Sequence, residues 1–216
     1  MCCFSYACDV DDYNFHAEMR MQRAVEECRW DDVLQEAARV KGPVTREMIM
    51  LRDIALINRG EFCSARYTYN KQSVPPLPIN DSVQIRIKDQ ASDLIYFNYG
   101  ESVFAIRRAM ERCMHYGYSY YTMRMLTQCA ILNGEKDNAL KYLRLLSKTF
   151  FQRKWVEEMR PYVDGVKPLQ ESACFRMPLK LYREGTELVG TDDNYVEMTL
   201  NKKRMYTLTT DPEAQQ

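Results

Sequence analysis

The sequence predicts an all-α protein in which antiparallel helix pairs stack as a tetratricopeptide-like right-handed superhelix. Apolar residues recur at helical spacing along most of the chain, and turns centred on glycine separate these periodic segments. Two turn residues, Gly100 and Gly134, lie 34 residues apart. Because a tetratricopeptide repeat is a helix pair of about 34 residues, this spacing favours a repeated unit.

The charge composition argues against two classes of partner. The chain has 216 residues, with 30 basic and 30 acidic side chains and a formal net charge of zero. General nucleic-acid binders and proteins that bind anionic membranes need a basic surplus or a basic patch. The densest basic clusters, Arg107–Arg108 with Arg112 and residues 202–204, are short, so we expect solvated helix faces there. No apolar run reaches the length of a membrane span, and the chain as given is expected to be soluble.

The eight cysteines and two histidines form no pattern typical of a metal or disulfide site. There is no Cys-x-x-Cys, and His16 and His115 fall in no zinc-ligand spacing. Several cysteines instead lie among apolar residues in helical patterns, where a free thiol acts as a small hydrophobic group. The sequence therefore predicts reduced thiols and neither a metal nor a cofactor.

Four helices are expected before the middle of the chain. The first runs from about Tyr13 to Arg29, and the second follows a turn at Trp30 and reaches about Val40. Thr45 can cap a third helix, which ends at the Gly60 turn, and a shorter fourth helix follows at 62–69.

A proline-rich segment, residues 70–82, interrupts this pattern and predicts an extended loop. The residues after it alternate like a strand, but helical spacing continues to about Phe97 and a lone strand would have no partner, so we favour a helix. A sixth helix then ends at Gly117, and Ser119 begins a seventh that reaches Leu132.

The eighth helix, 136–150, has the cleanest apolar stripe, which includes Phe150. A ninth is expected to end at Arg160, because Pro161 follows it. One more helix is possible at 191–208. The last residues, "DPEAQQ", resemble a helix start, which suggests a fragment of a longer chain. We therefore expect an irregular segment 1–10, a repeat domain 11–163 and a less regular segment 164–216, for which packing on the repeats is one option.

The same turn recurs three times. A glycine is followed by glutamate and, four residues later, by alanine, as in Gly60-Glu61 with Ala65, Gly100-Glu101 with Ala105, and Gly134-Glu135 with Ala139. Glycine can adopt the left-handed conformation that ends a helix, and glutamate suits the amino terminus of the next. Alanine allows the two helices to approach closely. The turn phrase therefore has an architectural role.

Three phrases resemble an uncharacterised family of multi-pass membrane proteins from Bacteroides-type bacteria, known only as a domain of unknown function. They are "ECRWDDVLQEA" from Glu27, "IALINRGEFCSARYTY" from Ile54, and "MLTQCAILNGEKDNALKYLRLLSKTFFQRKWVEE" from Met125. The similarity covers about residues 9–163. It implies a soluble tetratricopeptide-like region and a membrane association through an N-terminal region that is missing here, and it implies no catalytic residues.

A protein-interaction scaffold is the leading functional hypothesis. Stacked helix pairs leave a concave surface lined by the first helix of each pair, and such surfaces bind peptides or helices. The polar residues expected on that surface are Arg46, Asp53, Arg86, Asp93, Tyr121, Arg124 and Gln128. Ordinary solvated side chains are the simpler interpretation of the same residues. The tyrosines at 116, 118, 120 and 121 are expected to pack between repeats, and an aromatic recognition patch is the alternative.

Two other functions remain open at this point. The second hypothesis is a structural soluble region of a larger membrane-associated assembly. A thiol enzyme would use Cys113 or Cys129 with His115 or His16, because a catalytic thiol needs a nearby base and an exposed setting. We expect Cys129 to face the core, and therefore expect no enzyme.

Overall fold

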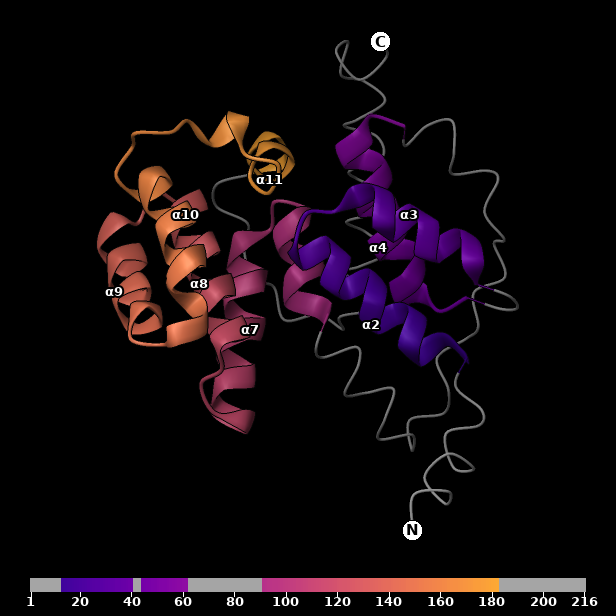
Figure 1. Ribbon diagram of the computed structural model, residues 1–216, viewed down its shortest axis with the longest axis horizontal. Coiled ribbons are helices and arrows are strands. Elements are labelled where there is room, and N and C mark those ends of the chain that lie inside the picture. Colours follow the sequence, from indigo (N-terminus) through magenta and orange to yellow (C-terminus); the bar gives the residue numbers. More distant parts are fainter. Residues whose placement is uncertain (1–12, 41–43, 62–90, 183–216) are drawn as a thin grey trace. The chain divides into compact units, whose positions relative to one another are not determined.

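The computed structural model describes residues 13–40, 44–61 and 91–182, and these ranges contain helices and no strand. Neighbouring helices pack in pairs, which confirms the all-α prediction (Figure 1). The right-handed superhelix stays a prediction. The expected helices at 62–69 and 191–208, the proline-rich loop and the segment 1–10 lie outside the described residues.

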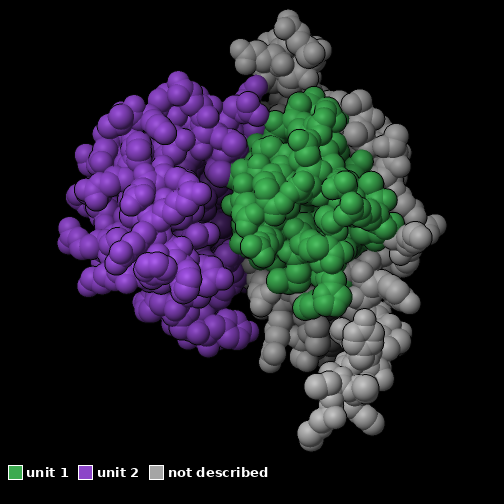
Figure 2. All heavy atoms as spheres, viewed as in Figure 1, with its two compact units in different colours: residues 1–88 green, residues 89–216 purple. Residues whose placement is uncertain are grey.

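The chain divides into two compact units, residues 1–88 and 89–216 (Figure 2). Unit 1 contains three described helices, each packed on the other two: α2 (Tyr13–Glu26), α3 (Trp30–Arg39) and α4 (Arg46–Arg59). Thr45 caps α4 as expected, because its side chain accepts a hydrogen bond from the Met48 backbone N–H. The Thr45 hydroxyl also donates to the Glu18 carboxylate, which ties the start of α4 to α2.

Unit 2 begins with a helical segment at 91–98 and continues through longer helices, two 3₁₀ turns and one short helix. The elements are α7 (Ser102–Tyr116), α8 (Tyr120–Leu132), α9 (Lys136–Ser147), η2 (Phe150–Gln152), α10 (Arg153–Val163), η3 (Leu169–Glu171) and α11 (Arg176–Leu181). α8 packs on both α7 and α9, and α9 packs on α10. Ser119 begins α8 with a capping box shared with Thr122.

The three predicted glycine turns share one hydrogen-bond pattern. At Gly60, Gly100 and Gly134 the glycine has a φ between 74° and 77°. Its N–H bonds to the carbonyl three residues earlier, and the next N–H bonds to the carbonyl five residues before it. This is the Schellman motif, which satisfies the last carbonyls of a helix and needs one left-handed residue. The architectural interpretation of the turn phrase agrees with this geometry.

Two further turns have the same Schellman hydrogen-bond pattern but lack the Gly-Glu sequence. Cys28 takes the left-handed position after α2, with a φ of 54°, so the turn lies two residues before Trp30, which is already helical. Gly165 takes it after α10. The predicted end of the ninth helix is therefore wrong. Pro161 lies inside α10, and the left-handed Gly165, not the proline, follows the end of that helix.

The expected eighth helix is also shorter than predicted. α9 ends at Ser147, and Thr149 has an extended backbone. Phe150 therefore leaves the helical phase that buries Ala139, Leu143 and Leu146, and its side chain is 74% exposed. Helical spacing placed Phe150 in the core because it assumed a helix that continues for another turn.

The residues after α10 pack back on the earlier helices of unit 2. Phe175 is fully buried, and its ring centroid lies 6.1 Å from that of Phe97 and 5.6 Å from that of Tyr162. Leu181 is also buried, and its backbone passes close to Gly100. A Cβ added at Gly100 would lie 2.6 Å from the Leu181 carbonyl carbon. Gly100 is therefore required both for the turn and for the passage of the chain beside it.

A matched pair of glycine substitutions tests this double requirement. Gly134→Ala places its Cβ in open space, so it should lower the free energy of unfolding by about 1–2 kcal/mol through left-handed strain alone. Gly100→Ala adds a collision with backbone atoms and should cost clearly more. Urea unfolding of both variants measures the difference. Equal losses would show that Gly100 has no close neighbour.

Candidate functional site

The sequence-predicted residues Asp93, Tyr121 and Arg124 cluster in unit 2. Asp93, in the helical segment 91–98, is fully buried. Its Oδ1 accepts hydrogen bonds from the Tyr121 hydroxyl at 2.9 Å, from the Leu94 N–H at 2.9 Å and from Arg112 Nη2 at 3.2 Å. Its Oδ2 lies 3.2 Å from Arg112 Nη1. One carboxylate thus joins the segment 91–98 to α7 and α8.

Arg112 was expected on a solvated helix face, and that expectation is wrong. Its side chain is only 11% exposed, and the guanidinium carbon lies 4.9 Å from the centroid of the Tyr121 ring. The neighbouring Arg107 and Arg108 are neutralised differently, because both pair with Glu111 on the same helix. The basic cluster on α7 is therefore largely paired within unit 2.

Burial decides the protonation of Asp93. Desolvation raises its pKa to about 6, and the opposing Arg112 charge and the hydrogen bond from Tyr121 only partly offset that effect. Such a buried carboxylate is costly to ionise, yet its ionised form is the one that pairs with Arg112. The cluster is a polar connection in which Arg112 and Tyr121 both bind the buried carboxylate.

Arg124, one turn after Tyr121 on α8, binds different elements. Its Nε donates to Gln152 Oε1 at 2.7 Å, and its guanidinium carbon lies 5.1 Å from the centroid of the Trp155 ring. It also lies 5.9 Å from the centroid of the Tyr120 ring. Since Gln152 and Trp155 belong to η2 and α10, Arg124 connects these elements to the first turns of α8.

The remaining predicted surface residues do not belong to this cluster. Asp53 is buried in α4 of unit 1, and Gln128 is half-buried on α8. The Arg46 side chain and Arg86 lie outside what the structure describes. The shared concave surface therefore stays a prediction.

The second half of α7 and the turn to α8 expose a group of large side chains, three of which are tyrosines that were expected to pack between repeats. Tyr118 is 78% exposed and Met114 is 87% exposed. We call this group the tyrosine–methionine surface, and its members are Met110, Met114, Tyr116, Tyr118 and Tyr120. The packing interpretation is wrong for the tyrosines at 116, 118 and 120. The fourth tyrosine, Tyr121, is half-buried and its hydroxyl donates to Asp93.

The thiols differ from expectation at two positions. Cys113 and Cys129 are free and buried, as predicted. Burial raises the pKa of Cys129 well above its ordinary value, which disfavours the thiolate that a nucleophile requires. Cys28 and Cys174 are disulfide-bonded, so the expectation of reduced thiols is wrong for these two residues.

Within the described ranges, no group of three or more His, Cys, Asp or Glu residues is placed to hold a metal ion. None of the described helices has both the length and the apolar character that crossing a membrane requires.

A family model described as a family of unknown function (DUF6057) matches residues 2–213. No curated protein and no solved structure matches the chain. The expected resemblance to a family without a known function is confirmed to that extent.

Asp93 should give the stability of the protein a measurable pH dependence. Because the folded state binds this proton more tightly than the unfolded chain, the contribution of Asp93 is greatest below about pH 4 and is lost as the pH rises through about 6. A difference of one in pKa corresponds to about 1.4 kcal/mol. Urea unfolding of wild type and Asp93→Asn between pH 4 and 7 should show the wild type losing stability relative to the variant. A constant difference would contradict the raised pKa.

The buried thiols should be unreactive in the folded protein. Iodoacetamide should modify Cys113 and Cys129 only as fast as the chain opens, because neither sulfur is accessible and Cys129 resists ionisation. Peptide mass spectrometry after timed alkylation, with and without urea, measures this. Rapid modification of one of them in the native state would revive the thiol-enzyme hypothesis.

Proposed function

This chain belongs to DUF6057, a family of unknown function, and we propose that it acts as a protein-interaction module. The observation that carries the proposal is the tyrosine–methionine surface at the α7–α8 turn. Folded proteins rarely leave contiguous large apolar side chains in water unless a partner covers them. Tyrosine and methionine are also enriched in the buried centres of protein interfaces.

The setting of this surface supports recognition by preorganised side chains. The turn lies between Arg112 and Tyr121, and both bind Asp93. The two helix ends that carry the exposed tyrosines are therefore fixed before a partner arrives, so less conformational entropy is lost on binding. Methionines at 110 and 114 lie one turn apart on α7 and can adapt to the shape of a partner.

The predicted concave surface is a less direct candidate. Its members Asp93, Tyr121 and Arg124 already bind other residues of unit 2. The tyrosines at 116, 118 and 120 are instead 61–78% exposed, so most of each side chain can meet a partner. A structural role in a membrane-associated assembly, and the link to multi-pass membrane proteins of Bacteroides-type bacteria, stay predictions from the resemblance.

Site-specific photo-crosslinking in the cell that produces the protein tests the proposal. A benzoylphenylalanine at Tyr118 should give a discrete crosslinked protein, whereas the same group at the exposed Lys167 should not. Changing Tyr116 and Tyr120 to serine should abolish that crosslink while the circular dichroism stays helical.

Identical crosslinks from positions 118 and 167 would contradict an interface at this turn. So would a Tyr118 crosslink that persists unchanged when Tyr116 and Tyr120 are both serine.

A further inference from the structure

A second surface of unit 2 combines unpaired cations with exposed apolar side chains. Between Lys136 and Trp155 the sequence has six basic residues and one acidic residue, Asp137. The zero net charge of the whole chain hides this local surplus. We call the exposed part of it the basic–aromatic surface, and its members are Lys141, Arg144, Leu145, Lys148, Phe150 and Phe151.

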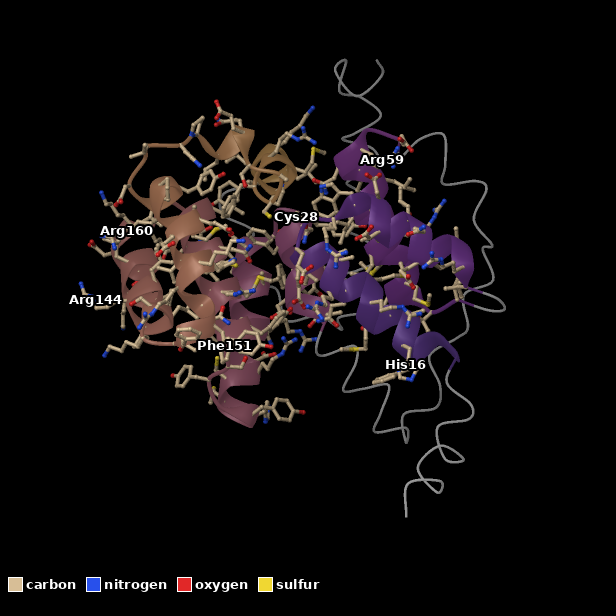
Figure 3. The ribbon with its side chains drawn as sticks, viewed as in Figure 1. His16, Cys28, Arg59, Arg144, Phe151 and Arg160 are labelled. Atoms are coloured by element: carbon tan, nitrogen blue, oxygen red, sulfur yellow. The ribbon has the colours of Figure 1, made fainter. Side chains whose placement is uncertain are left out.

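The cations form one stripe on α9. Lys141, Arg144 and Lys148 are spaced by three and four residues, so they share a helix face, and all three are exposed. None of the three forms an ion pair with any residue that the structure describes. Arg144 points away from the helices of unit 2 (Figure 3). These charges are therefore available to a partner, unlike those of α7.

Apolar groups lie among and beyond these cations. Leu145 is 48% exposed between Arg144 and Lys148. Phe150 and Phe151, just past the end of α9, are 74% and 84% exposed, and their main ring contact is with each other, edge to face at 5.5 Å. Arg153 places its guanidinium carbon 5.7 Å from the centroid of the Phe150 ring. Two phenylalanines thus project at the end of a basic helix face.

We propose that this surface docks on an anionic phospholipid bilayer, with Phe150 and Phe151 entering the headgroup region and the α9 cations meeting the lipid phosphates and carboxylates. Basic residues near an anionic membrane and apolar side chains at its boundary act together in peripheral binding. The nearby acidic side chains only partly reduce the attraction between the α9 cations and an anionic bilayer. Asp137 lies at the far end of the stripe, and Glu158 is paired with Lys154 at 4.0 Å.

Two observations favour a bilayer over other anionic partners. A single-stranded nucleic acid stacks successive bases on aromatic faces, but the Phe150 and Phe151 rings are 86° apart and Leu145 offers no stacking face. A protein partner would need a pocket that fits two projecting phenylalanines. A bilayer interface accepts them without shape complementarity.

Vesicle co-sedimentation of the full chain tests the proposal without any other protein, so its outcome is independent of the interaction module. The chain should bind vesicles of phosphatidylcholine with 30% phosphatidylserine at ~0.1 M salt, and at least tenfold more weakly at ~0.5 M salt or without phosphatidylserine. Changing Lys141, Arg144 and Lys148 to glutamine should weaken binding at least tenfold. A control removes three positive charges elsewhere, through Arg23→Gln, Arg39→Gln and Lys167→Gln, and should bind nearly as wild type.

A separate measurement tests the contribution of Phe150 and Phe151 to vesicle binding. Phe150→Ser with Phe151→Ser should weaken binding to the same vesicles several-fold, and a tryptophan at Phe150 should be quenched by brominated lipid. Three results would overturn the proposal: no binding of the wild type to the anionic vesicles, equal losses in the control and the α9 variant, or tighter binding to an oligothymidylate or a polyglutamate peptide than to the vesicles.

Discussion

The Asp93 carboxylate is the interaction on which the geometry of unit 2 depends most. It belongs to the segment 91–98 and binds α7 through Arg112 and α8 through Tyr121. Removing one partner from a buried charge pair leaves the other uncompensated, which typically costs several kcal/mol. The cost of burying Asp93 is visible in its raised pKa, because the contacts with Arg112 and Tyr121 offset that cost only in part.

This constraint explains why an exposed turn can be an ordered one. Arg112 and Tyr121 lie on either side of the α7–α8 connection, and Gly117 and the Ser119 capping box fix the chain between them. The tyrosines at 116, 118 and 120 therefore project from helix ends and a turn that are already fixed. One turn further along α8, Arg124 binds Gln152 and Trp155 and so holds η2 and the start of α10, the elements that contain and flank the exposed phenylalanines.

Sequence reasoning succeeded where a local rule decides the outcome. Gly100 and Gly134 end helices because the left-handed conformation favours glycine, and Thr45 and Ser119 begin helices because their hydroxyls satisfy free backbone N–H groups. Sequence reasoning failed where a residue distant in the sequence determines the position of a side chain or the room for the backbone. Nothing local shows that Arg112 is drawn inside by Asp93, 19 residues earlier, or that Gly100 must admit the backbone of Leu181. Two local features were also missed. α9 ends at Ser147 without a glycine to mark the end, and this early end exposes Phe150. Cys28 occupies a left-handed position that glycine usually takes.

Hydrogen exchange of the full chain, wild type against Asp93→Ala at neutral pH, tests most directly whether Asp93 holds the surface that we propose for binding, because alanine removes the acceptor of Tyr121 and Arg112. The account predicts faster exchange in the last turn of α7 and the first turn of α8, around residues 112–123, and little change in α9 and α10. Unchanged protection at the α7–α8 turn, or an equal loss throughout unit 2, would contradict the claim that this one carboxylate positions the exposed tyrosines.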